Sequence, residues 1–165
     1  MIRSGLGVDS HRFEAGRPLI LGGVDIPHEE GLAGHSDADV LTHAIIDALL
    51  GAAGLGDIGQ HFPDTDERYK DADSLELLRT VVVFLGDNGF RIIHVDATVM
   101  MERPKLARYR DAIRETLSAA MQIGLGHVNV KATTGERMGF VGRGEGVAAM
   151  ALATLDRPEE LPAQR

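Results

Sequence analysis

One helical segment constrains the fold of this chain more than any other, because it is apolar nearly all round. Residues 31–51 read "GLAGHSDADVLTHAIIDALLG", and the spacing predicts a largely buried helix over residues 37–53. Three ionisable side chains nevertheless lie inside it: Asp39, His43 and Asp47. Steps of four residues drift only about 40° each around a helix, so these side chains form one narrow line. Buried ionisable groups are costly unless they are paired or bind a metal; an exposed polar stripe is the alternative interpretation.

Strands and helices alternate along the rest of the sequence. Ser36 or Asp37 is the expected N-cap of the first helix. The other expected helices begin near Asp73 or Ser74 and span residues 106–123. Strands are expected at residues 2–11, on both sides of Gly22-Gly23, at 90–101 and at 127–133. The Ala-rich segment 147–155 fits a helix or a strand.

This order of elements predicts an α/β protein, in detail an α+β sandwich with a mixed β-sheet and helices on one face. The helices are too few to cover both faces, and several strands are apolar on both sides. The other sheet face is therefore expected to pack in the core of an oligomer. Residues 1–156 are expected to form a single domain, followed by a polar C-terminal tail at 157–165.

The composition excludes several classes of function. The chain has 165 residues and a formal net charge of −8, with no basic stripe, so nucleic acid is not an expected partner. It has no Cys, so a metal would have to take His and carboxylate ligands. The sequence shows neither a signal-peptide pattern nor an apolar run of the length that spans a membrane, and we expect a cytoplasmic protein.

The motif Asp9-Ser10-His11 suggests where a metal would bind. Alternate residues of a strand point to the same face, so Asp9 and His11 present an oxygen and a nitrogen side by side. With His43 they make a His₂Asp set, and three protein ligands with one open position are typical of catalytic zinc. Asp39 or Asp47 could then orient the free ring N–H of His43. The alternative is a hydrogen-bonded core histidine with no ligand role.

Two further segments could bind phosphate. His35 and Ser36 precede the first helix, whose N-terminal N–H groups attract anions, although Ser36 could be only a cap. The segment "KATTGE" ends a strand with Thr133, Thr134 and Glu136, and a hard cation such as Mg²⁺ prefers a carboxylate plus substrate phosphates. A solvated turn is the alternative for this segment.

Six motifs, taken together, resemble one enzyme family across about residues 2–155. The sequence is similar to the 2-C-methyl-D-erythritol 2,4-cyclodiphosphate synthases of the non-mevalonate route to isoprenoids. The motifs are "GVDSHRF", "LGGVDIP", "GLAGHSDADVLTHAIIDALLGAAGLGDIGQHFPDTD", "ERPKL", "VNVKATTGERMGF" and "GRGEG".

The resemblance implies a cyclising phosphorus–oxygen lyase. Its substrate would be 4-diphosphocytidyl-2-C-methyl-D-erythritol 2-phosphate, and its products 2-C-methyl-D-erythritol 2,4-cyclodiphosphate and CMP. Zinc would be held at Asp9, His11 and His43. Magnesium or manganese would be held at Glu136. The residues implied to stabilise the transition state are His35 and Thr134.

The resemblance also implies substrate contacts and an assembly. The substrate positions are Ser36, Asp57, Ile58, Gly59, Phe62, Asp64 and Asp66, the cytidine-binding stretch Met101, Pro104, Lys105, Leu106 and Ala107, and Thr133, Phe140 and Arg143. The family forms a homotrimer with sites between subunits, and its last segment is a strand. Phe140 and Arg143 would ring an axial cavity that could hold an isoprenoid diphosphate.

Two other functions use the same residues. A zinc-dependent phosphohydrolase would need the same His₂Asp set but would release inorganic phosphate. A trimeric binder of isoprenoid diphosphates would bind without turnover. Gly135 and Arg137 stand where some relatives carry Thr and Lys; Gly135 could loosen the loop that aims Glu136, which makes the second metal site the less constrained of the two.

Overall fold

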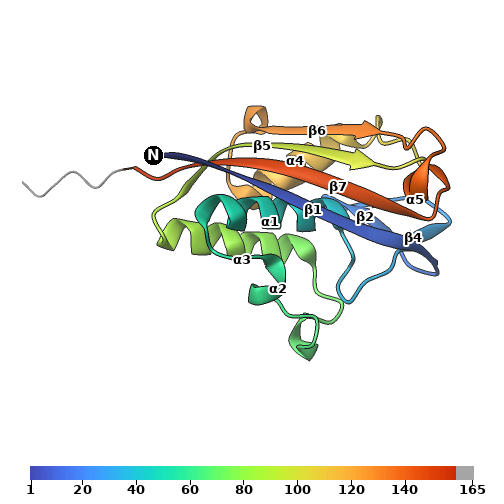
Figure 1. The fold of residues 1–165 in the computed structure, drawn as a ribbon, viewed down its shortest axis with the longest axis horizontal. Coiled ribbons are helices and arrows are strands. Elements are labelled where there is room, and N and C mark those ends of the chain that lie inside the picture. The colour runs from blue at the N-terminus through green and yellow to red at the C-terminus, as the bar shows by residue number, and fades with distance from the viewer. Residues whose placement is uncertain (159–165) are drawn as a thin grey trace, which may run out of the picture.

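The computed structural model describes residues 1–158, which form a curved sheet with a helix layer on one face (Figure 1). The five-stranded sheet has the order β4-β1-β7-β5-β6. Only the β5–β6 pair is parallel among these pairings, so the sheet is mixed, as expected. The strands are β1 (Ile2–Ala15), β4 (Glu30–Leu32), β5 (Arg91–Met100), β6 (Val128–Thr133) and β7 (Gly146–Asp156).

A separate hairpin lies between β1 and β4 in the sequence. It pairs β2 (Leu19–Leu21) with β3 (Val24–Ile26) around Gly22-Gly23, which confirms the predicted turn. Both glycines have positive φ, as a tight hairpin turn requires. The hairpin matters for the site because its turn is anchored on the first helix, as described below.

Three long helices cover one face of the sheet (Figure 1). They are α1 (Val40–Ala53), α3 (Ser74–Asp87) and α4 (Arg110–Met121). The shorter elements are α2 (Ile58–His61), α5 (Gly139–Gly142) and two 3₁₀ turns at Glu67–Tyr69 and Leu125–His127. Helix α1 is buried almost throughout, so the burial predicted from its composition is confirmed. None of the helices in residues 1–158 has the length and hydrophobicity needed to cross a bilayer.

The start of α1 differs from the sequence prediction. Neither Ser36 nor Asp37 is the N-cap; Asp39 is, and its carboxylate accepts a hydrogen bond from Thr42 N–H at 3.0 Å. Ala38 lies in the left-handed region with φ of +56°, and this conformation interrupts any helix beginning earlier. The start predicted for α4 was also too early, because the chain before Arg110 forms turns. The polar tail predicted at 157–165 falls largely on residues 159–165, outside the described part.

Helix α1 approaches β1 very closely because two glycines face it. A Cβ on Gly5 would lie 2.2 Å from Ala48 O, and a Cβ on Gly7 would lie 1.9 Å from Ala44 O. Both distances are far below van der Waals contact with backbone atoms that cannot move aside. Since α1 carries His43 and β1 carries Asp9 and His11, this close approach sets the spacing of the three candidate ligands.

We expect Gly7→Ala to destabilise the protein by about 3 kcal/mol or more, because the added methyl overlaps the backbone of α1. Gly51→Ala is the matched control: it lies on α1 with nothing within 4 Å of the new Cβ, and it should gain about 0.5–1 kcal/mol. Urea denaturation followed by circular dichroism measures both. Equal midpoints for Gly7→Ala and the wild type would contradict this account of the packing.

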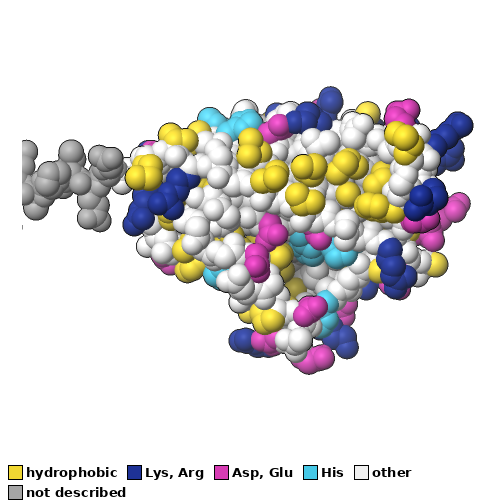
Figure 2. Space-filling view, viewed as in Figure 1, with side chains coloured by type: hydrophobic (Ala, Val, Ile, Leu, Met, Phe, Trp, Pro, Cys, Tyr) yellow, Lys and Arg dark blue, Asp and Glu magenta, His cyan; other side chains and the backbone are white. Residues whose placement is uncertain are grey.

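The second face of the sheet carries exposed apolar side chains. Ile2, Leu6 and Val8 of β1 are 64%, 61% and 54% exposed, and Met150 and Leu152 of β7 are 39% and 47% exposed. Figure 2 shows yellow side chains gathered in a band along these strands, with histidine side chains in a hollow below it. A band of this kind is unusual on a monomer and is typical of a surface that a partner covers.

Candidate metal centre and substrate cavity

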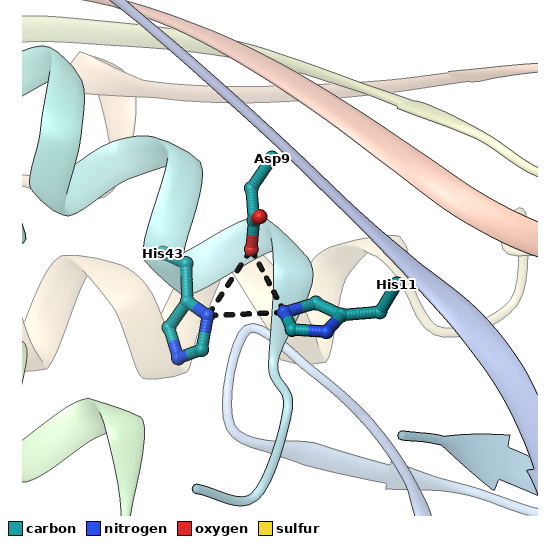
Figure 3. A group of neighbouring side chains, drawn as sticks. All are labelled: Asp9, His11 and His43. Carbon is teal, nitrogen blue, oxygen red and sulfur yellow. Dashed lines mark hydrogen bonds and ion pairs between the residues drawn. The ribbon is translucent and has the colours of Figure 1, made fainter. Parts of the chain in front are cut away.

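Asp9, His11 and His43 converge on one point between β1 and α1 (Figure 3). Asp9 Oδ2 lies 3.0 Å from His11 Nε2 and 3.1 Å from His43 Nδ1, and the two ring nitrogens lie 3.4 Å apart. Within residues 1–158 this is the group of three His or acidic residues whose ligand atoms come close enough to share an ion. The strand alternation that predicted Asp9 and His11 on one face is confirmed, and so is their meeting with His43.

The electrostatics of the group suit a bound cation. Burial alone would raise the pKa of Asp9, but hydrogen bonds and charge interactions with His11 and His43 outweigh it and hold that pKa well below its ordinary value. Burial would lower the pKa of His11, yet the hydrogen bond and charge of Asp9 raise it overall. His11 Nδ1 lies 2.7 Å from Ala33 O, so Nδ1–H donates there and Nε2 faces the other two ligands.

Neither acidic neighbour predicted to orient His43 does so. The Asp39 carboxylate is fully buried and accepts from Gly22 N, Gly23 N and Thr42, so it joins the β2–β3 turn to the start of α1. Asp47 accepts from Ile58 N at 2.8 Å and anchors α2. The four-residue spacing correctly placed Asp39, His43 and Asp47 on one side of α1, but it did not identify the groups that contact the His43 ring. The groups near His43 Nε2 are Ser74 Oγ at 2.8 Å and Ser36 Oγ at 3.2 Å.

A cavity of about 450 Å³ opens beside the candidate ligands. His35 and Ser36 line it from the loop before α1, whose N-cap is Asp39; that they bind phosphate stays a prediction. The predicted residues that line the cavity are His11, His35, Ser36, His43, Ile58, Gly59, Phe62 and Asp64.

The cavity also has walls that sequence reasoning missed. Gly34, Pro63, Tyr69 and Leu77 line it; the first two lie within the longest family motif but were not singled out, and the other two lie outside the motifs. Asp57 and Asp66 are not among the lining residues. Asp57 caps α2 by accepting from Gln60 N at 2.9 Å, and Asp66 pairs with Arg68 on the surface.

The other predicted residues lie elsewhere in the chain. Thr134 Oγ1 donates to Glu136 Oε1 at 2.8 Å, and Glu102 Oε1 accepts from Gly135 N at 2.8 Å, so the loop after β6 is tied to the segment after β5. Glu136 and Arg137 both have positive φ, an unusual conformation for two consecutive non-glycine residues. A small hollow of about 130 Å³ lies nearby and includes Leu106 and Ala107 in its wall.

The candidate metal ligands and the loop after β6 do not meet within one chain. The strand register puts Ser10 of β1 level with Ala148, Met100 and Thr133 on the next three strands. Three interstrand steps of about 4.8 Å separate β1 from β6 by about 14 Å. The loop that carries Thr133, Thr134 and Glu136 therefore lies at the same end of the sheet as the candidate metal ligands. It is too far across the sheet to act with them in the same chain.

Phe140 lies in the short helix α5 and Arg143 directly follows it; neither lines the cavity beside the candidate metal ligands. Phe140 is 42% exposed, and the Arg143 guanidinium pairs with Glu145, with Nε 2.6 Å from Oε1. Arg143, Arg103 and Arg137 line an open cavity of about 810 Å³. Phe140 is not part of its wall. Whether Phe140 and Arg143 surround an axis in an assembly stays a prediction.

Comparisons with known proteins identify the family of this chain. The sequence model of the YgbB family matches residues 2–156. The 2-C-methyl-D-erythritol 2,4-cyclodiphosphate synthase of Alkaliphilus oremlandii is 56% identical over 154 residues, which are 93% of this chain and 98% of that protein.

Solved structures give the same result for the fold. The bifunctional IspDF of Campylobacter jejuni matches with a TM-score of 0.93 and 43% identity over 96% of this chain, which corresponds to 43% of that longer protein. A 2C-methyl-D-erythritol-2,4-cyclodiphosphate synthase in a CDP-bound form matches with a TM-score of 0.86 and 39% identity, covering 93% of this chain and all of that one (100%). From residue 2 to residue 156, this chain therefore belongs to the YgbB family, whose curated relatives are 2-C-methyl-D-erythritol 2,4-cyclodiphosphate synthases.

Proposed function

We propose that this chain cyclises 4-diphosphocytidyl-2-C-methyl-D-erythritol 2-phosphate at the cavity beside Asp9, His11 and His43. The products are 2-C-methyl-D-erythritol 2,4-cyclodiphosphate and CMP. The observation that supports the site most strongly is that the three candidate ligands, His35 and Ser36 share one cavity with the 58–64 segment. Relatives that bear the enzyme's name and are more than half identical support the reaction.

The chemistry needs positioning more than it needs a strong base. The 2-phosphate is already an anion and attacks the β-phosphorus, while the bond from that phosphorus to the bridging oxygen of CMP breaks. His35 lies beside the reacting phosphates and, with Thr134, stabilises the charge that develops in the transition state. The loop at Asp57–Asp64 holds the methylerythritol chain, so the nucleophile and the diphosphate are fixed in reach of each other.

The donor set fits zinc at the first metal site. One carboxylate oxygen and two imidazole nitrogens lie within 4.8 Å of one another, and this is the ligand chemistry of a catalytic zinc with an open position. The Glu136 carboxylate suits a harder cation, magnesium or manganese. When bound, the two ions polarise the β-phosphate and neutralise charge on the diphosphate. Asp9, as a carboxylate ionised at neutral pH, supplies the negative charge of this donor set.

The complete site is formed between two copies of the chain. Within one chain the 133–136 loop and the candidate metal ligands are three strands apart, so a neighbouring copy supplies the loop and the cytidine-binding stretch 101–107. The exposed apolar band of β1 and β7 is the surface that the copies bury. We propose a homotrimer, and light scattering should give three times the chain mass. Phe140 and Arg143 would then face an axial cavity suited to an isoprenoid diphosphate.

Phosphorus NMR of the products tests the reaction. The purified protein with zinc and magnesium should convert the substrate to CMP and a cyclic diphosphate, whose two phosphorus signals differ from those of the linear diphosphate. Inorganic phosphate as the product would instead identify a phosphohydrolase. Binding of the substrate without any change in its spectrum would identify a binding protein.

A further inference from the structure

The side of the His43 ring that faces away from Asp9 is held by a second group of polar residues. Nδ1 faces Asp9 and His11, whereas Nε2 lies 2.8 Å from the hydroxyl of Ser74. Ser74 is fully buried at the first position of α3. Its hydroxyl also contacts Asp37 Oδ1, and its backbone N–H donates to Asp37 Oδ2 at 3.0 Å. Asp37 in the loop before α1, Ser74 on α3 and His43 on α1 thus form a continuous chain of hydrogen bonds.

Counting protons in this chain fixes the direction of each bond. The Asp37 carboxylate only accepts, and it also receives the N–H of Asp39 at 3.1 Å. The single hydroxyl proton of Ser74 must therefore go to Asp37, which leaves the Ser74 oxygen as an acceptor. The donor to that oxygen can only be His43 Nε2–H. When the ring is neutral, its lone pair is therefore on Nδ1, directed at the point where the candidate ligands converge; a second proton on Nδ1 would be donated to Asp9 Oδ2, 3.1 Å away.

We propose that Asp37 and Ser74 are positioning residues that fix the ring orientation and tautomer of His43 for metal binding. The proposal deepens the proposed function, since it rests on His43 as a ligand. The two histidines are held differently: His11 donates to a backbone carbonyl, whereas His43 depends on side chains. Partners of this kind typically contribute 10–100-fold to metal affinity or activity.

The structure argues against a merely structural role for the pair. The N-terminus of α3 already has a cap, since Asp73 accepts from Leu75 N at 2.9 Å. A cap alone would not require a hydroxyl at Ser74, because Asp37 accepts the backbone N–H of that residue. Ser36 Oγ lies farther from His43 Nε2, at 3.2 Å, and it also accepts from Ala38 N–H, so it is a weaker partner for the ring.

The test uses Ser74→Ala and Asp37→Asn, with Thr80→Ala as a matched control. Thr80 is an exposed hydroxyl on the same helix that donates to Glu76 O at 2.9 Å. Long-range nitrogen–proton NMR of the metal-free proteins, recorded at a pH at which the His43 ring is neutral, reports which of its nitrogens is protonated. We expect Nε2–H in the wild type and in Thr80→Ala, and a mixture of tautomers in both other variants. In Asp37→Asn the amide NH₂ can donate to the Ser74 oxygen, and the Ser74 hydroxyl then donates to His43 Nε2, which favours the Nδ1–H tautomer. Otherwise the amide loses its contact with Ser74, and the hydroxyl is no longer held in one direction.

Zinc affinity is the second readout, measured by competition with a chelating dye. Ser74→Ala and Asp37→Asn should bind zinc about 10–100-fold more weakly, and Thr80→Ala should match the wild type. An unchanged tautomer and a zinc affinity within twofold of the wild type in a folded variant would overturn the proposal. If Ser74→Ala does not fold, Asp37→Asn decides it. If the wild type binds no zinc, the proposed metal centre fails, but the tautomer measurement still decides whether the pair fixes His43.

Discussion

His43→Ala is expected to lower zinc affinity by about a hundredfold or more and to abolish detectable turnover. Zinc bound by four ligands is held by about 10–16 kcal/mol, so one ligand contributes roughly 3 kcal/mol, which is more than a hundredfold. The remaining pair, Asp9 and His11, lies on one strand and leaves two coordination positions open to water. Elemental analysis after dialysis against a mild chelator measures the metal content.

An exposed histidine is the control for this substitution. His127 lies in a 3₁₀ turn away from the candidate ligands, and His127→Ala should keep the full zinc content. Circular dichroism separates metal loss from unfolding. His43 is not among the buried residues of α1, so we expect the helix to stay packed without its imidazole. A His43→Ala protein that retains one zinc per chain would show that the metal ligands have been assigned wrongly.

Glu136→Gln should retain zinc and the assembly but lose about 10²–10³ in kcat. The amide has nearly the same shape and can still accept the hydrogen bond from Thr134 Oγ1, so the loop should keep its conformation. It lacks the charge that a hard divalent cation requires from this loop. The charge on the departing CMP is then less compensated in the transition state, a deficit typically worth about 3–4 kcal/mol. Steady-state kinetics should therefore show a large fall in kcat with little change in KM.

Glu115→Gln on the exposed side of α4 is the matched control and should leave kcat unchanged. A magnesium titration strengthens the test, because a weakened site should be rescued only in part by excess ion. Wild-type turnover of Glu136→Gln at every magnesium concentration would exclude Glu136 as a metal ligand. The loop would then contact the substrate through Thr133 and Thr134 alone.

The sequence predicted the parts of the site that follow from local periodicity. Strand alternation placed Asp9 and His11 side by side, and the apolar pattern of α1 placed His43 in the interior. The groups that hold His43 could not be found in this way, because Ser74 reaches it from a helix that begins 31 residues later. Asp39 and Asp47 share its helix face, but Asp39 is turned to the β2–β3 hairpin and Asp47 to α2.

Tertiary packing also determined whether segment 147–155 forms a helix or a strand, which its composition had left open. The segment at 147–155 is rich in Ala, which favours a helix, yet it forms the central strand β7 between β1 and β5. Its side chains on the α1 side include Ala149, Ala151 and Ala153, all buried. Small residues there let α1 pack against β7 as well as against β1. This requirement comes from a distant helix and overrides local preference.

Activity of mixed assemblies tests most directly whether the candidate metal ligands and the 133–136 loop of different chains complete one active site. His43→Ala and Glu136→Gln are each expected to be inactive alone. When they are co-expressed and assemble at random, each site has a one-half chance of an intact metal set and a one-half chance of an intact neighbouring loop, so about a quarter of the sites are complete. CMP release should therefore recover to about a quarter of the wild-type rate. Mixed assemblies that release no more CMP than the separate variants would show that each site is built within a single chain, contrary to this account.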